Sequence, residues 1–92
     1  MAQVFKISKT DEELGLENPW HVILYNDKVH SFDEVVFQVQ KAAGISLERA
    51  SKITLQAHLN GRAVVFIGDQ DRSKKIASIL ESIALRTSVE RT

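Results

Sequence analysis

The chain has 92 residues, of which 43% are hydrophobic and 26% are charged, a length and balance typical of one globular domain. Its 12 lysines and arginines equal its 12 aspartates and glutamates, so no net field attracts nucleic acid or an anionic membrane, and neither is expected as a partner. The absence of cysteine excludes disulfides, thiolate catalysis and Cys-containing metal sites, and it fits a cytoplasmic protein.

No segment has the pattern of a membrane span or a signal peptide. The longest unbroken apolar run, residues 63–67, is far shorter than the roughly 20 residues that cross a bilayer. The first residues lack the apolar core of a signal peptide. Residues 1–18 combine many charges with scattered apolar positions, which predicts a flexible N-terminal extension before a core of residues 19–92.

The first two predicted elements are a strand and a helix. Residues 21–25 form a short apolar, partly β-branched run that precedes turn-forming residues, which indicates a strand. Ser31 followed three residues later by Glu34 is the pattern of a capping box, and apolar side chains then recur at helical spacing as far as Gly44. The spacing predicts a helix over residues 32–43.

A second helix and a second strand follow. The helix is expected to begin after Ser46 and to end before Gly61, with a narrower apolar stripe. Residues 62–67 are the most strand-like segment of the chain. Their nearly continuous apolar character predicts a central strand that is buried on both faces.

The last third of the chain predicts a helix and a final strand. Asp69 or Asp71 can cap the helix, whose apolar residues on one face continue to Ala84, and alternation from Leu85 onward indicates a strand. The order is β-α-α-β-α-β. Elements of this size predict an α+β fold in which three helices pack on one face of a small sheet.

Reactive groups do not form a known catalytic or metal-binding motif. His21, His30 and His58 lack the spacing of helical zinc ligands, and they belong to a strand, a loop and a helix. Residues 68–71 lack the later ligands of a calcium loop, and the glycines lie too far apart to cradle phosphate. No metal, cofactor or catalysis is therefore expected.

The remaining polar cluster has two interpretations. Asn26 and Asp27 follow the first strand, and His58 lies on the last turn of the second helix. In one interpretation these residues form an ordinary turn and a hydrogen-bonded helical histidine. In the other, their oxygens and a neutral imidazole nitrogen converge on a donor such as a protonated amine. Spacing alone leaves both open.

The chain resembles the ClpS adaptor family from about Pro19 to Glu90, in order and with nearly the family's spacings. The segments that carry the resemblance are residues 19–27, 32–36, 40–42, 49–50, 57–65 and 85–90. The most specific part is the His-x-x-Gly-[Lys/Arg]-Ala pattern that begins at His58, combined with the upstream Asn26-Asp27.

The resemblance implies a small α/β sandwich with a three-stranded antiparallel sheet, similar to the C-terminal domain of the ribosomal stalk protein. It also implies a bacterial adaptor, not an enzyme, that binds proteins whose first residue is Leu, Phe, Tyr or Trp. Such adaptors deliver these proteins to a ClpA or ClpC unfoldase, whose N-terminal domain would be the docking partner. A cytoplasmic monomer is expected.

By the same resemblance, Asn26 and His58 would hold the substrate α-amine, and Asp27 would add negative potential at the mouth of a pocket. The pocket walls would be Phe32, Val35, Thr54, Ala57 and Leu85. Plain core packing explains Val35, Ala57 and Leu85 equally well. The docking surface for the unfoldase would be Gln70, Asp71 and Lys75, near the start of the third helix.

Two positions depart from the family pattern. Lys28 replaces a common second acid, and a cation there would repel an incoming ammonium. Thr54 stands where many family members have methionine, and the smaller threonine would widen the pocket. Two further functions compete with the adaptor: an interaction domain that has lost degron recognition, favoured by Lys28, and a hydrolase using His58, for which no nucleophile motif is present.

Overall fold

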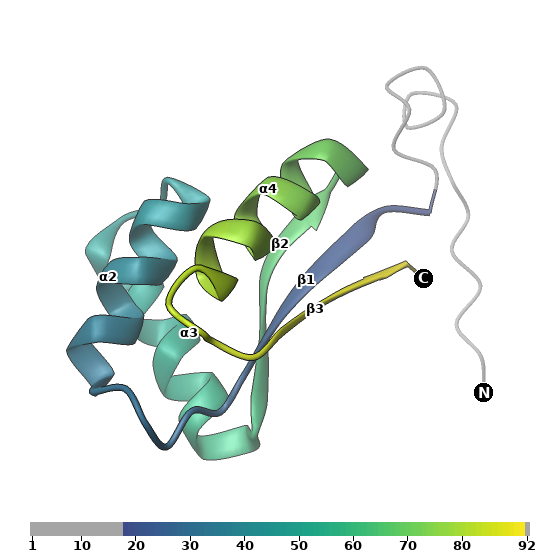
Figure 1. Cartoon of the computed structure of the whole chain (residues 1–92). Helices are drawn as coiled ribbons and strands as arrows, with labels where there is room; N and C mark the ends of the chain where they lie inside the picture. Colours follow the sequence, from purple (N-terminus) through teal and green to yellow (C-terminus); the bar gives the residue numbers. More distant parts are fainter. Residues whose placement is uncertain (1–17, 92) are drawn as a thin grey trace.

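The computed structural model describes residues 18–91, which form three helices and a three-stranded antiparallel sheet (Figure 1). In chain order the elements are β1 (Trp20–Tyr25), α2 (Phe32–Ala43), α3 (Leu47–Asn60), β2 (Arg62–Gly68), α4 (Gln70–Glu81) and β3 (Thr87–Arg91). This order confirms the predicted β-α-α-β-α-β arrangement and the α+β class. Apart from Asn18, the predicted flexible extension lies outside the described residues.

Strand β1 lies at the centre of the sheet, between β2 and β3. Both neighbours run antiparallel to it, and Leu24 is paired with Ala63 on one side and with Thr87 on the other. Val22 and Leu24 are fully buried and belong to the core, and Figure 1 shows the three helices gathered on one side of the sheet. The side chains of β1 that point to this side therefore pack against helices.

The prediction that residues 62–67 form the central strand is wrong. They belong to β2, an edge strand, in which buried Ala63 and Val65 alternate with Val64 and Ile67, whose exposed fractions are 43% and 58%. Only one face of β2 meets the helices, so the alternate side chains stay in solvent. A run of apolar residues does not by itself distinguish a strand buried on both faces from an exposed edge.

Helix α2 begins as the sequence predicts. The Ser31 hydroxyl oxygen accepts a hydrogen bond from the Glu34 amide at 3.2 Å, and the Glu34 carboxylate accepts one from the Ser31 amide at 3.0 Å. These bonds from Ser31 hold the pKa of the Glu34 carboxyl below its ordinary value. Gly44 ends the helix in the left-handed conformation, with φ of 65°, which a residue without a side chain adopts readily.

The other two helices also begin at a residue whose side-chain oxygen accepts a backbone hydrogen bond, but the end of α4 differs from the prediction. Of the two candidate caps, Asp69 is the one used, since its carboxylate accepts a hydrogen bond from the Arg72 amide at 3.0 Å. The apolar pattern predicts that this helix continues to Ala84, whereas α4 ends at Glu81. Ala84 has φ of 63° and therefore belongs to the turn that leads into β3.

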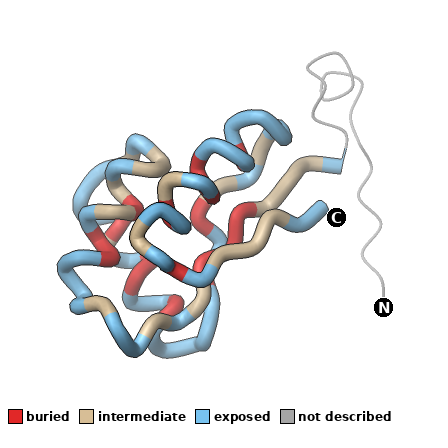
Figure 2. Tube along the Cα trace, in the orientation of Figure 1, coloured by how far each residue is buried: buried red, intermediate tan, exposed pale blue. Residues whose placement is uncertain are grey.

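The core lies where the helices meet the sheet, as the buried positions in Figure 2 show. One polar bond helps to fix α2 against α4, because the side-chain amide Nε2 of Gln38 donates to the Ile79 carbonyl at 2.6 Å. None of the helices between residues 18 and 91 has both the length and the apolar character that a bilayer-crossing segment needs.

Candidate functional site

The loop between β1 and α2 is fixed to the end of α3 by a backbone contact. The Asn26 amide donates a hydrogen bond to the Gly61 carbonyl at 2.9 Å, and the Gly61 amide donates to the Ala57 carbonyl at 2.9 Å. His58 lies on the helical turn that precedes Gly61. Two chain segments that are about thirty residues apart in sequence are therefore held next to each other.

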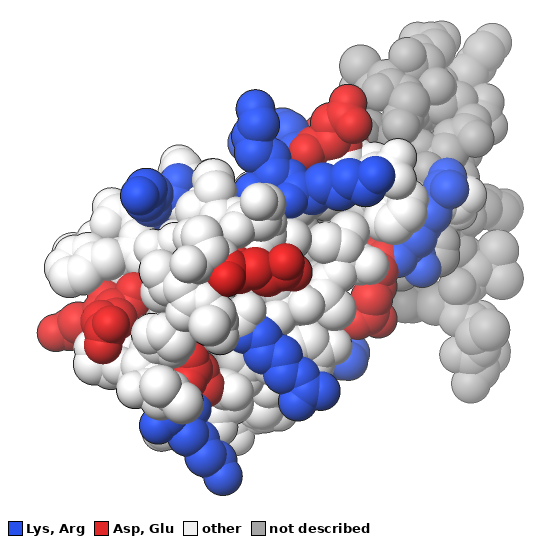
Figure 3. Space-filling model, in the orientation of Figure 1, with Lys and Arg blue, Asp and Glu red and all other residues white. Residues whose placement is uncertain are grey.

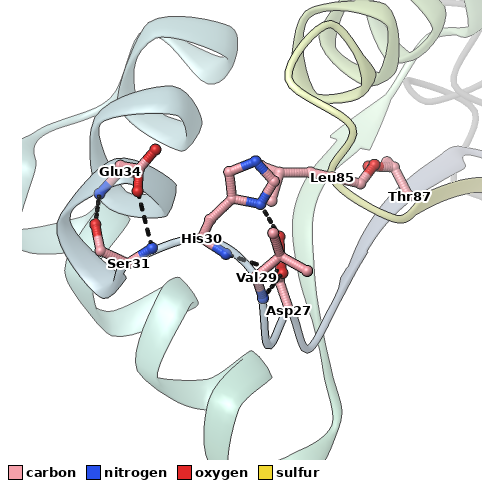
Figure 4. A network of polar contacts seen from close by, with 7 residues as sticks. All are labelled: Asp27, Val29, His30, Ser31, Glu34, Leu85 and Thr87. Carbon is pink, nitrogen blue, oxygen red and sulfur yellow. Dashed lines mark hydrogen bonds and ion pairs between the residues drawn. The ribbon is translucent and has the colours of Figure 1, made fainter.

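Asp27 organises the same loop (Figure 4). One carboxylate oxygen accepts hydrogen bonds from the Val29 amide at 2.6 Å and the His30 amide at 3.2 Å, and the other oxygen contacts Nδ1 of the His30 ring. The side chains of His30 and Asp27 are 16% and 10% exposed, respectively. Asp27 thus fixes both the backbone of the loop and the orientation of the His30 ring.

The surroundings of Asp27 favour its ionised form. Partial burial acts to raise the pKa of the Asp27 carboxyl, but the hydrogen bonds from Val29 and His30 oppose this and together outweigh it. The pKa of Asp27 is therefore lower than its ordinary value of 3.8. A carboxylate with these contacts remains negatively charged at neutral pH.

This lowered pKa makes part of the folding stability depend on pH. A carboxyl whose pKa is lower in the folded state stabilises the fold above its unfolded pKa, and the contribution is lost as the pH falls through the folded value. We expect wild type to be more stable than Asp27→Asn at about pH 6, and the difference to shrink as the pH falls below about 4. Urea unfolding of both proteins across this range measures the difference, and a constant difference would contradict the assignment.

A cleft of about 420 Å³ opens between this loop, α2 and α3. It is lined by the end of β1, by residues of the loop and by one side of each of the two helices. The lining residues are Leu24, Tyr25, Asn26, Asp27, Lys28, His30, Phe32, Val35, Thr54, Ala57 and His58.

The lining residues fall into two groups, exposed residues at the mouth of the cleft and buried residues that form its inner wall. Asn26 and His58 are exposed, as is Lys28, so polar groups border the solvent. Val35, Thr54 and Ala57 are only 6%, 5% and 3% exposed, and they form an inner wall. The Thr54 hydroxyl donates to the Ala50 carbonyl at 2.8 Å, so its hydrogen-bonding demand is met within α3. The cleft therefore combines a polar mouth with an apolar interior.

The structure brings most of the predicted pocket residues into this one cleft, with one exception. Leu85 is 2% exposed and belongs to the hydrophobic core, and it is absent from the residues that line the cleft. Its position thus corresponds to the alternative of plain core packing. The predicted docking residues Gln70, Asp71 and Lys75 lie exposed on the first turns of α4 and do not line the cleft.

His30 lines the cleft although neither the sequence pattern nor the family resemblance predicts a role for it at the site. The sequence does carry a signal for its position. Asp27 lies three residues before His30, and the helix-capping Ser31 follows directly. At this spacing the carboxylate can bind the histidine ring across a short loop. That signal is weak without the three-dimensional contact.

Charged side chains of both signs are mixed on the molecular surface, and the described residues form no cluster of metal ligands. Figure 3 shows cationic and anionic side chains interspersed over one face of the molecule. Within residues 18–91, no group of three or more histidine, aspartate or glutamate side chains is placed to hold a metal ion.

Comparison with known sequences identifies the family. The sequence profile described as "ATP-dependent Clp protease adaptor protein ClpS" matches residues 16–89. The chain belongs to the ClpS family. The ClpS adapter protein of Corynebacterium jeikeium is 30% identical over 86 residues, which cover 94% of this chain and 83% of that protein. The Mycobacterium marinum ClpS adapter protein is 33% identical over 73 residues, with coverages of 79% and 72%.

A solved structure of another ClpS protein supports the fold. Agrobacterium tumefaciens ClpS2, bound to L-phenylalaninamide, superposes with a TM-score of 0.76 and covers 82% of this chain and 98% of its own. Its sequence identity is 20%, so this likeness concerns the fold. ClpS relatives are named as adaptors of the Clp protease and not as enzymes, in agreement with the expectation that this chain performs no catalysis.

Proposed function

We propose that this ClpS protein binds N-terminal degrons through their free α-amine and an apolar first side chain, Leu, Phe, Tyr or Trp. It then delivers the bound protein to the N-terminal domain of a ClpA or ClpC type unfoldase in the bacterial cytoplasm, acting as a monomer. The observation that carries the proposal is the cleft, in which Asn26 and His58 border a mouth and apolar side chains form the interior.

The mouth offers the chemistry that an ammonium group needs. The side-chain oxygen of Asn26 and a neutral His58 ring can each accept a hydrogen bond from the α-amine. Asp27 already accepts bonds from Val29 and His30, so it acts mainly through its negative charge. The two acceptors and the nearby carboxylate together replace the water that an ammonium loses on binding.

The interior offers an environment for the first side chain. A large apolar side chain gains about 25 cal/mol for each Å² of surface that it removes from water. Phe32, Val35 and Ala57 supply apolar contacts along the cleft. The ligand of A. tumefaciens ClpS2 has the same two features, a free α-amine and an aromatic side chain. This supports a substrate of the same kind for the present chain.

Fluorescence anisotropy with peptides that differ only in the first residue tests this proposal. We expect Leu-, Phe-, Tyr- and Trp-initiated peptides to bind with micromolar or tighter affinity, and N-acetylation to remove the binding, because it removes the positive charge and the donors of the amine. Binding that is equally strong with acetylated peptides would contradict the proposal.

Lys28 favours a second candidate function. Its side chain lines the cleft, where a cation weakens the attraction of a substrate ammonium. The alternative is a ClpS-like interaction domain that docks on the unfoldase and modulates it, with weak or altered degron specificity. Binding to the N-terminal domain of the unfoldase in the absence of any amine-dependent peptide binding would favour this alternative. A gain of peptide affinity in Lys28→Asp, together with amine-dependent binding by wild type, would favour the adaptor.

Thr54 leads to a prediction about the size of the first residue. Replacing Thr54 with methionine adds side-chain volume to an inner wall that is 5% exposed at this position. We expect Thr54→Met to weaken binding of Ile-initiated peptides by several-fold more than that of Leu-initiated peptides, since a β-branched side chain is widest near the backbone. Anisotropy titrations of both peptides measure the two affinities. If the ratio of the Leu-peptide affinity to the Ile-peptide affinity is the same in wild type and variant, the size argument is refuted.

The docking surface for the unfoldase is proposed on α4. Gln70, Asp71 and Lys75 are exposed there and away from the cleft, so a partner could bind them while a degron occupies the cleft. Changing Asp71 to Lys should weaken binding to the unfoldase N-terminal domain and leave peptide affinity unchanged. Asp69, which caps the helix, must be kept so that α4 remains folded.

A further inference from the structure

His30 lies in the loop that lines the cleft, where its ring can contact a bound substrate. It lines the cleft, and its side chain is 16% exposed, whereas Asn26 and His58 are exposed residues at the mouth. In the proposed function, the α-amine and the peptide chain remain at the mouth. Because His30 is less exposed than both proposed amine acceptors, its ring is better placed than they are to meet the first side chain of the substrate.

The contact with Asp27 determines which nitrogen of the His30 ring is free. An ionised carboxylate only accepts hydrogen bonds, so Nδ1 carries the proton that is shared with Asp27. In a neutral ring, the second nitrogen, Nε2, is then an acceptor. Figure 4 shows this nitrogen pointing away from Asp27.

The free nitrogen also remains accessible. Among the described residues, no hydrogen bond is made to Nε2 of His30, and no fully buried side-chain nitrogen or oxygen lacks a partner. Nε2 is therefore not fully enclosed, and His30 is one of the residues that line the cleft. The lining of the cleft thus includes one oriented ring nitrogen for which the described residues supply no partner.

We infer that His30, held by Asp27, selects first residues that carry a hydrogen-bond donor at the far end of the side chain, tyrosine above all, over phenylalanine. This inference rests on the proposed degron-binding function. A neutral hydrogen bond typically changes affinity by roughly three- to tenfold. We expect Tyr-initiated peptides to bind tighter than Phe-initiated peptides by that factor.

The test compares three peptides that differ only in the first residue: Tyr, Phe and 4-methylphenylalanine. The methyl group fills about the same volume as the hydroxyl but cannot donate a hydrogen bond. At about pH 8, where imidazole is ordinarily neutral, anisotropy should show Tyr bound tighter than both of the others. Equal binding of Tyr and 4-methylphenylalanine peptides would overturn the inference, and this comparison needs no variant.

A variant then assigns the preference to His30. His30→Leu removes the acceptor and leaves the backbone bonds to Asp27 in place, so the Tyr to Phe affinity ratio should fall to about one while Phe binding persists. His21→Leu is the matched control, because His21 lies on β1 and does not line the cleft. An equal loss for both peptides in His30→Leu would overturn the inference, since it would show that His30 does not distinguish the tyrosine hydroxyl.

The two proposals fail in different ways. If wild type binds no peptide in an amine-dependent manner, the degron-binding function is wrong. If it binds Tyr- and Phe-initiated peptides in an amine-dependent manner but with equal affinity, only the role of His30 is wrong.

Discussion

Replacing both Asn26 and His58 with alanine should raise the dissociation constant for a Leu- or Phe-initiated peptide by at least about a hundredfold. Each side chain is expected to accept a hydrogen bond from a charged ammonium, and such bonds contribute about 1.5–3 kcal/mol each. The single variants should each lose about tenfold or more. Anisotropy titrations with one labelled peptide measure all three variants against wild type.

Gln56→Ala is the control for these variants. Gln56 is exposed on α3, the helix that carries His58, but it does not line the cleft. The peptide affinity of Gln56→Ala should match that of wild type, and thermal unfolding should show that all the proteins are folded. A double variant that binds within about threefold of wild type would show that the amine is held elsewhere.

Replacing Leu80 with alanine should lower the free energy of unfolding by about 2–5 kcal/mol. Leu80 is fully buried on α4, in the core between the helices and the sheet, and it does not line the cleft. Its removal costs both the apolar burial and the contacts around the cavity that is left. For a small domain this is a large part of the total stability. Urea unfolding measures the loss.

Leu59→Ala is the matched control for this prediction. Leu59 is 69% exposed, so the same chemical change should alter stability by less than about 0.5 kcal/mol. A loss below about 1 kcal/mol in Leu80→Ala would contradict the assignment of Leu80 to a closely packed core.

The helices of this fold could be predicted well because their ends are marked by local chemistry. Ser31, Ser46 and Asp69 each cap a helix through a side-chain oxygen, and Gly44 and Gly61 each end one with positive φ. These contacts lie within a few residues of one another. The end of α4 was less predictable, because Ala84 adopts a positive φ without being glycine.

The order of the strands within the sheet could not be predicted from the local sequence pattern. Residues 63–67 are the longest unbroken apolar run of the chain, yet β2 lies at the edge, with Val64 and Ile67 in solvent. Which strand becomes central depends on pairing between distant segments. The same limit applies to the cleft: the family resemblance pointed to Asn26 and His58, but the orientation of His30 depends on its contact with Asp27.

The hydrogen bond between the Asn26 amide and the Gly61 carbonyl means that main-chain atoms set the spacing of the two proposed amine acceptors. Gly61 also has φ of 88°, which is strained for any residue with a side chain. A substitution of Gly61 would disturb both the end of α3 and the spacing between Asn26 and His58, even though Gly61 offers no side chain to a ligand. A substitution of Gly61 should therefore lower the affinity for a degron peptide although every side chain that contacts the peptide is still present.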